Sequence, residues 1–499
     1  MYAFDGHVPA VLLRLDRNPF HHGTLGAVRS LGRKGVEVHA VVEAGGGPVG
    51  RSRYLRATHP GPAGGLDPEA PEALLECLVG VSERIARPAV LVAMDDLSAI
   101  AVSRVAPMLT DRFRIPHQPD DLPARVADKA ELARLCARWD VPHPETVVPE
   151  SGTEAARAAW ALGLPLVAKW SRPWLLPAGS GLRSTTLVDS SAGARELYER
   201  SAEAGSRLLL QRFLPAGPDT DWFFHGAFGR GGRPLLAGSG RKELAWPVRA
   251  GLTAVGRWLA DPAVEESGLR LAERLGYQGI LDLDFRRDER GAFRLVDFNP
   301  RPGAQFRLFA DDAGLDVVQA MYLDLTGQRV PEPAGGPGRV FVAENYALLA
   351  AVRGRSLPRR PGGSAPAAAP PGGAGAVPGS ARPGPVRAPE AGERGRVEAA
   401  WFAADDPAPF LAMLCALLGR GLDKGARVLR GVPAQGRRGA RAVRAPRQRG
   451  GGRDDGLAAA GPGAGPAGGP GAARQAPPGT VAPPGAPAAP VGPDELVTR

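Results

Sequence analysis

The chain has 499 residues, enough for two or three domains, and its 62 Lys and Arg side chains outnumber its 52 Asp and Glu side chains. The excess lies at one end: residues 1–352 carry 41 basic and 42 acidic side chains, whereas residues 353–499 carry 21 and 10. Because the larger part is nearly neutral, we expect no specific nucleic-acid binding, and any binding by the basic end would be lost in salt.

Two features predict a cytoplasmic protein. We see no signal peptide, and no stretch of eighteen apolar residues could form a transmembrane segment. The three cysteines, Cys77, Cys136 and Cys415, are far apart and lack the spacing of a metal site, which indicates reduced thiols.

Residues 10–43 predict the opening of a doubly wound α/β domain, with a strand, a loop, a helix from Leu25 to Leu31 and a second strand. They lack the Gly-x-Gly-x-x-Gly pattern of a dinucleotide site. A later apolar strand ends at Asp95 and Asp96, and we expect both to cap the helix that follows, with a binding role at this end of the sheet as the alternative.

Residues 128–139 predict an amphipathic helix with Asp128 as its N-cap. Lys129 lies in the first turn, where a positive charge opposes the helix dipole, so we expect it to have another partner. Residues 165–188 predict strand, loop and strand, with Lys169 in the first strand and a glycine-rich loop that could hold phosphate. The chain has five lysines beside 57 arginines, which suggests that lysine is kept where a compact charge is needed.

Residues 208–228 predict two strands joined by a Pro/Gly turn, and the second contains Asp221. His225 lies in the same strand, and we expect it, like His21 and His22, to be structural rather than catalytic.

Residues 279–301 predict a β-hairpin with Asp-Glu-Arg-Gly at its turn. Side chains two apart share a face of a strand. Two polar pairs therefore share faces and can converge across the hairpin: Asp282 with Asp284, and Asp297 with Asn299. Oxygen ligands of this kind suit Mg²⁺. A solvated edge strand is the alternative.

The C-terminal part is rich in Pro, Gly, Ala and Arg, and we expect residues 353–396 and 423–499 to be a disordered linker and tail. A shifted reading frame or compositional drift would also produce such a composition. Between them, residues 397–422 predict a short apolar helix that docks on the main body, with a membrane surface as the alternative.

These motifs, in this order, resemble the ATP-grasp superfamily, and in particular its carboxylate–amine ligase branch, which includes D-aspartate ligase-like enzymes. The hairpin sequence Asp-Phe … Asp-Phe-Asn-Pro-Arg is the most specific part of the match. The resemblance implies a mixed α/β and α+β fold. A Rossmann-like pre-ATP-grasp domain would span residues 1–120, an ATP-grasp domain residues 121–330 and a connecting segment residues 331–352.

The resemblance also implies a role for individual residues. Those matched to nucleotide binding are Lys129 and Lys169 for the phosphates, Ser180 and Gly181 in the lid loop Ala178–Thr185, Gln211, Phe213 and Leu214 for adenine, and Asp221 for ribose. Those matched to Mg²⁺ are Asp284, Asp297 and Asn299. Those matched to substrate or phosphoryl stabilisation are Arg301, Lys242 and Arg249.

ATP and Mg²⁺ are the implied cofactors, with two ions expected and Mn²⁺ as a substitute. The implied reaction joins a small-molecule carboxylate to an amine through an acylphosphate. A ligase of another substrate class, such as a biotin carboxylase-like or phosphoribosyl-type enzyme, and a nucleotide-binding protein without catalysis are the alternatives.

Two positions depart from the family pattern. Arg212 stands where many relatives have glutamate, and Leu182-Arg183 replaces a lid glycine. The sequence names neither substrate and leaves the oligomeric state open, a homodimer included.

Overall fold

The structure is a computed structural model. It describes residues 2–16, 18, 20–42, 47–62, 71–119, 121–177, 179–217, 219–246, 252–356 and 396–429. Two compact units divide the chain, residues 1–433 and residues 434–499, and every element named below belongs to the first. Two of the predicted site positions, Ala178 and Arg249, lie outside the described residues, as do residues 357–395 of the predicted linker and residues 430–499 of the predicted tail.

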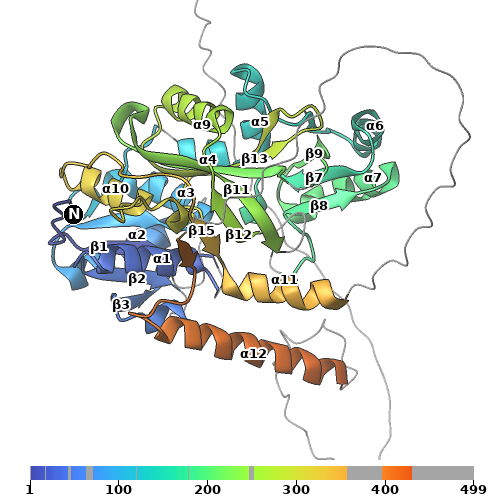
Figure 1. The fold of residues 1–499 in the computed structure, drawn as a ribbon. Coiled ribbons are helices and arrows are strands. Elements are labelled where there is room, and N and C mark those ends of the chain that lie inside the picture. The colour runs from blue at the N-terminus through green and yellow to red at the C-terminus, as the bar shows by residue number, and fades with distance from the viewer. Residues whose placement is uncertain are drawn as a thin grey trace, which may run out of the picture. The chain divides into compact units, whose positions relative to one another are not determined.

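A five-stranded parallel sheet opens the chain, in the order β3-β2-β1-β4-β5 (Figure 1). Its elements are β1 (Ala10–Leu13), α1 (His22–Gly32), β2 (Val38–Val42), β3 (Leu55–Pro60), α2 (Glu72–Ile85), β4 (Ala89–Ala93), α3 (Asp96–Val105) and β5 (Phe113–Arg114). The strands β1 and β2 are buried throughout, as expected for a parallel sheet with both faces covered. The predicted doubly wound domain is thus present.

The first helix is longer than the sequence pattern indicated. It begins at His22 rather than Leu25, because the side chain of His21 accepts a hydrogen bond from the backbone N–H of Thr24 and caps the helix. The chain leaves the helix through Gly35, whose φ of +83° favours glycine.

A four-stranded antiparallel sheet follows, in the order β6-β9-β7-β8, with its own apolar core. The elements of this part are α4 (Leu122–Ala127), α5 (Lys129–Arg138), β6 (Thr146–Val147), α6 (Gly152–Leu162), β7 (Leu166–Trp170), β8 (Thr185–Val188), α7 (Ser191–Glu199), α8 (Ser201–Ala204) and β9 (Leu208–Arg212). The predicted N-cap is confirmed, since the carboxylate of Asp128 accepts from the N–H groups of Ala130 and Glu131.

The third sheet has seven strands in the order β14-β13-β10-β11-β12-β15-β16. The elements are β10 (Asp221–Phe228), β11 (Pro234–Trp246), β12 (Leu252–Trp258), α9 (Pro262–Leu275), β13 (Gly279–Arg287), β14 (Phe293–Asn299), α10 (Val317–Leu325), β15 (Val340–Val342), α11 (Glu344–Ser356) and β16 (Val397–Ala399). Figure 1 shows α9 over this sheet and α10 nearer the first sheet.

Two neighbouring residues of β10 pack into different apolar clusters, one on each face of this sheet. Phe223 packs in one apolar cluster with residues of α10, and Phe224 in another with residues of α9. Gly268 of α9 lies against Phe224 so closely that a Cβ there would meet the ring at 2.5 Å. Because successive side chains of a strand point to opposite faces, β10 packs against α10 on one face of the sheet and against α9 on the other.

The C-terminal segment completes the third sheet. Residues 397–422 are not a single short helix: β16 pairs in parallel with β15, and α12 (Ala408–Leu429) follows and extends into the predicted tail. The expected docking on the main body is present. Arg29 Nε donates to Asp406 Oδ2 at 2.9 Å, and both side chains are buried. The predicted connecting segment, residues 331–352, contributes β15 and most of α11. Among the described helices, none combines the length and apolar character needed to cross a membrane.

Candidate functional site

The hairpin of β13 and β14 gathers four polar side chains on one face. In its register Asp284 lies opposite Asp297, and Asp282 lies opposite Asn299. The intervening residues Leu283 and Phe298 point into the apolar core on the other side. The expected convergence across the hairpin is thus present in the structure.

Three lysines from separate elements meet this face. Lys129, the first residue of α5, forms an ion pair with Asp297. A partner was expected from its unfavourable place in the helix dipole, but the sequence did not indicate which residue it is. Lys169 of β7 donates to the backbone oxygen of Val296 at 2.9 Å. Lys242 of β11 lies 3.5 Å from Asp284. Three of the five lysines of the chain therefore surround two carboxylates.

The electrostatics of this cluster depend on its loss of water. Burial lowers the pKa of Lys169 to about 8, although Asp297 nearby opposes the shift. Burial also raises the pKa of Asp284, together with the charges of Asp282 and Asp297. For Asp297 itself, the two lysines Lys129 and Lys169 outweigh burial and hold its pKa below the usual value.

The donor set fits a hard divalent cation. Asp284 and Asp297 offer carboxylate oxygens, and the amide nitrogen of Asn299 donates to Asp282, which leaves its amide oxygen as an acceptor. In the part of the chain that the structure describes, no three His, Cys, Asp or Glu side chains form a metal cluster by themselves. Mg²⁺ in proteins commonly uses one or two carboxylates and takes its other ligands from phosphates and water. The residues present therefore fit an ion that arrives with a polyphosphate.

Arg301 lies at the far end of the same face. Its Nη1 is 3.2 Å from Asp282 Oδ2, and its Nε is 3.2 Å from Asp96 Oδ1. The expectation that Asp95 and Asp96 both cap α3 is therefore half wrong. Asp95 does accept from the N–H of Ser98 at 2.8 Å, but Asp96 is directed to the arginine, because the third sheet brings Arg301 against the start of α3.

Asp282 was not among the residues for which the resemblance predicted a role in the site, yet it contacts two of its side chains. Its carboxylate receives Arg301 and also lies 2.6 Å from Nε2 of His225, whose side chain is fully buried. The packing around this pair is tight, since a Cβ on Gly303 would meet the ring of His225 at 2.2 Å. The two-residue spacing from Asp284 was the available signal. His225 supports Asp282 from β10, which agrees with a structural role.

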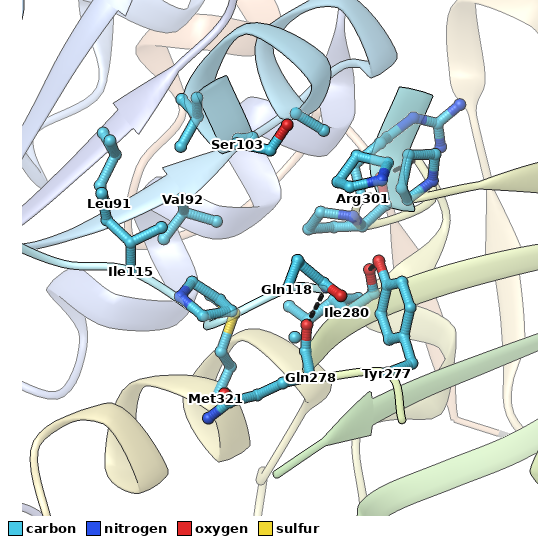
Figure 2. Close-up of a pocket in the computed structure, with 18 residues that line it drawn as sticks. Leu91, Val92, Ser103, Ile115, Gln118, Tyr277, Gln278, Ile280, Arg301 and Met321 are labelled. Carbon is cyan, nitrogen blue, oxygen red and sulfur yellow. Dashed lines mark hydrogen bonds between the residues drawn. The ribbon is translucent and has the colours of Figure 1, made fainter. Parts of the chain in front are cut away.

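A small cavity of about 60 Å³ lies beside Arg301 (Figure 2). Leu91 and Val92 of β4 and Ile115, which follows β5, line one side, and residues 277–280 and 300–302 line the other. Gln118 donates to the backbone of Gln278 across it. The cavity lies where the first and third sheets meet.

The other predicted residues form a second group, with Gln211 in the second sheet and Asp221 in the third. Asp221 pairs with Arg286 Nε at 2.6 Å, and Arg286 Nη1 donates to the backbone oxygen of Leu214 at 3.1 Å. This arginine was not foreseen, and it ties the predicted ribose acid to the predicted hinge. The side chain of Gln211 is held by Thr146 at 3.0 Å.

The predicted hinge and lid differ in their local structure. Phe213 and Leu214 follow β9, which ends at Arg212. The Arg212 side chain is exposed and pairs with Glu145 at 2.6 Å. In the lid, Gly181 has a φ of +75°, and the Oγ of Ser180 accepts from the N–H of Leu182. Lys169 of the lysine–carboxylate cluster lies opposite Thr185, the last residue of the lid loop, in the register of β7 and β8.

No family model matches the chain. Among curated proteins, it is 24% identical over 244 residues to the C-terminal section of the carbamoyl phosphate synthase large chain of Methanopyrus kandleri, a match that covers 45% of this chain and 43% of that protein. It is 25% identical over 183 residues to the carbamoyl phosphate synthase large chain of Deinococcus radiodurans, covering 35% of this chain and 17% of that protein. The chain thus matches less than half the length of either relative.

Solved structures resemble the chain over a larger share. The biotin carboxylase domain of 2-oxoglutarate carboxylase from Hydrogenobacter thermophilus, solved with MgADP, ADP and bicarbonate, has a TM-score of 0.51 at 17% identity, covering 66% of this chain and 73% of that one. An ADP complex of N5-carboxyaminoimidazole ribonucleotide synthetase has a TM-score of 0.50 at 10% identity, covering 71% and 86%. At such identities the likeness concerns the fold.

The fold and the hairpin motif point to the same family. A parallel Rossmann-like sheet precedes two antiparallel sheets, and lysines from both antiparallel parts meet the carboxylates of the Asp-Phe … Asp-Phe-Asn-Pro-Arg hairpin. The fold, the arrangement of the site and the remote sequence matches agree with the resemblance to the ATP-grasp superfamily.

Proposed function

We propose that this protein is an ATP-dependent carboxylate–amine ligase. The observation that carries the proposal is the pairing of Asp284 with Asp297 across the hairpin, surrounded by Lys129, Lys169 and Lys242 from three other elements. A cluster of acidic oxygen ligands beside a cluster of cations is what transfer of a phosphoryl group between two anions requires.

In this proposal, ATP binds with its phosphates at the lysines. Lys129 and Lys169 contact the phosphates, Ser180 and Gly181 close over them, Gln211, Phe213 and Leu214 meet adenine, and Asp221 binds ribose. Asp284, Asp297 and Asn299 would hold Mg²⁺, which neutralises charge on the phosphates when bound. Two ions, and Mn²⁺ as a substitute, remain part of the proposal.

The reaction has two steps. A carboxylate oxygen of the first substrate attacks the γ-phosphorus of ATP, and the bond from that phosphorus to the oxygen of ADP breaks, which releases ADP and leaves an acylphosphate. The amine nitrogen then attacks the acyl carbon, the bond from that carbon to the phosphate oxygen breaks, and loss of one proton leaves an amide and inorganic phosphate.

The residues of this chain act by position and charge. Arg301, held by Asp96 and Asp282, faces the negative charge that builds on the transferred phosphoryl group, and Lys242 supports the acyl substrate. Arg249 belongs to the same proposal but lies outside the described residues. Water has to be kept from the acylphosphate, and the lid loop is the segment placed to do so.

The test is release of ADP by the full chain with Mg²⁺·ATP and a panel of acids and amines. Asp297→Asn should reduce the rate by about a hundredfold or more. Glu289→Gln, an exposed charge at the turn of the same hairpin, is the matched control and should have no effect. An Asp297→Asn variant with full activity would contradict the proposal.

The panel also separates the candidate substrates. D-aspartate with amines tests the D-aspartate ligase-like subtype. Bicarbonate tests the alternative suggested by the biotin carboxylase structure, which was solved with bicarbonate. Binding of Mg²⁺·ATP without turnover of any pair would favour a nucleotide-binding protein without catalysis. A homodimer, as in the solved biotin carboxylase domain, and a cytoplasmic location complete the proposal.

A further inference from the structure

A second cavity, of about 280 Å³, lies outside the site described above. It is enclosed by α1, by residues 304–307 and by the C-terminal segment from β16 to Asp405. A single water needs about 10–15 Å³ of such space, so the cavity is large enough for a small metabolite. None of the predicted nucleotide, metal or phosphoryl-transfer residues lines it.

The charged side chains of this cavity are mostly arginines. Arg29, Arg33 and Arg307 line it, against two carboxylates, Glu398 and Asp405. Each of these arginines is paired with a carboxylate: Arg29 with Asp406, Arg33 with Asp405, and Arg307 with Asp316 and Glu398. Guanidinium groups are the usual recognition elements for carboxylate and phosphate because their N–H groups match those oxygens in geometry.

Two of the arginines each have one guanidinium nitrogen that is not used in these ion pairs. Arg29 uses Nε and Nη2 on Asp406, and Arg307 uses Nε on Glu398 and Nη1 on Asp316. Over the described residues, neither Nη1 of Arg29 nor Nη2 of Arg307 has a hydrogen-bond partner in the protein. These ion pairs therefore hold the guanidinium groups in place and leave one nitrogen of each able to donate to a ligand.

His22 supplies a further unused polar group. Its side chain is 3% exposed and lines the cavity, yet neither ring nitrogen has a hydrogen-bond partner. Burial lowers its pKa to about 4, so the ring is neutral near pH 7 and offers one donor and one acceptor. A buried polar group without a partner costs stability, which a ligand in the cavity would recover.

We propose that this cavity binds a compact oxyanion, the carboxylate or the phosphate group of a small metabolite. The surplus of donors over acceptors favours a ligand that brings oxygen acceptors, and the pairing of each arginine with a carboxylate favours a ligand of low charge. This inference is independent of the ligase proposal, because it uses other residues and another cavity.

Calorimetric titration of the full chain with inorganic phosphate and, separately, with L-lactate tests the proposal. We expect one-to-one binding of at least one probe with a dissociation constant of about 1 mM or lower. Binding of phosphate alone identifies a phosphate site, and binding of lactate alone identifies a carboxylate site. Binding of neither probe would overturn the proposal.

Variants locate the binding. His22→Phe preserves an aromatic ring among Phe341, Tyr346 and Trp401 and removes only unpartnered nitrogens, so folding should be retained while affinity falls about tenfold or more. Arg33→Gln should weaken binding similarly. Arg53→Gln is the matched control, because Arg53 contacts the backbone of Asp405 at 3.4 Å without lining the cavity.

Asp297→Asn distinguishes this cavity from the nucleotide site. Probe binding that is unchanged by Asp297→Asn and weakened by His22→Phe supports the proposal. Binding that changes with Asp297→Asn and is insensitive to both His22→Phe and Arg33→Gln would place the probes at the lysine cluster and overturn it. Failure of ATP turnover affects neither outcome.

Discussion

At the scale of single residues, the site is defined by charges that compensate one another. Asp297 is held ionised by two lysines, whereas Asp284 is exposed to the fields of two other carboxylates. Burial lowers the pKa of Lys169, whose direct contact is a neutral backbone oxygen. These differences lead to two predictions.

The first concerns pH. Because burial lowers the pKa of Lys169 to about 8, this lysine is charged at pH 7 and largely neutral at pH 9.5 in the free protein. The charged form favours phosphate, so affinity for Mg²⁺·ADP should fall as pH rises through 8, by up to about tenfold per unit. Calorimetry between pH 7 and 9.5 measures this, and Lys169→Arg should remove the dependence. A flat wild-type profile would contradict the prediction.

The second concerns Asp282, a positioning residue that holds Arg301. Asp282→Asn keeps the shape but removes the charge that faces Arg301 and His225. We expect kcat to fall about ten- to a hundredfold with little change in KM for ATP. The reason is that a displaced Arg301 stabilises the transition state, in which charge develops on the phosphoryl group, less well, whereas the binding of ATP is little affected. Steady-state kinetics measures both constants.

The control is Asp288→Asn, the same change in the turn of the same hairpin, where the carboxylate pairs with Arg294 at 2.9 Å. Equal effects of the two substitutions, or an effect on KM alone, would rule out positioning of Arg301.

At the scale of elements, the C-terminal segment is an integral part of the fold. β16 extends the third sheet, and Trp401 is fully buried and donates to Asn345 at 3.1 Å. The adjacent Asp405 and Asp406 both pair with arginines of the first domain, but in different surroundings. Asp406 is buried with Arg29, whereas Asp405 and Arg33 are partly exposed.

This contrast predicts unequal effects of the same substitution. Asp406→Asn removes the negative charge that compensates buried Arg29 and leaves one oxygen where two accept from Arg29, Ser52 and the N–H of Arg53, so it should cost about 3–5 kcal/mol of unfolding free energy. Asp405→Asn should cost about 1 kcal/mol or less, because water screens an exposed pair. Urea unfolding of both variants measures the difference. Equal costs would show that the segment is not anchored by Asp406.

At the scale of the whole molecule, the candidate site depends on all three sheets. The four-stranded part supplies Lys129 and Lys169, the seven-stranded sheet supplies the carboxylates and Lys242, and the first domain supplies Asp96 to Arg301. The third sheet in turn includes β16, which follows α11 in the chain. The integrity of the site is therefore linked to residues far beyond the predicted ATP-grasp boundary at residue 330.

Truncation tests this link. A chain ending at residue 433 keeps every described element and should unfold at the temperature of the full chain. A chain ending at residue 352 loses β16 and α12 and uncovers the apolar surface against which Trp401 packs, so its melting temperature should fall by several degrees or more. Thermal unfolding measures both. Equal stability of the two truncated chains would contradict the prediction.

The features that depend on neighbours along the chain could be predicted from the amino-acid sequence. The Asp128 cap, the strands of the first domain and the hairpin face shared by Asp282, Asp284, Asp297 and Asn299 all follow from spacings of two to four residues. Such spacings are set by the backbone geometry of helices and strands, so they can be read without knowledge of the fold. The resemblance to the ATP-grasp superfamily, which rests on the order of these motifs, was confirmed.

The contacts between distant segments could be seen only in the folded protein. The pair of Lys129 with Asp297 joins residues 168 positions apart, and the pairs of Arg301 with Asp96 and of Arg29 with Asp406 also connect separate parts of the chain. The addition of β16 to the third sheet and the unpartnered nitrogens of buried His22 have the same origin. These features depend on how apolar faces pack against one another, and the local pattern of a segment does not specify which distant side chain lies across that packing.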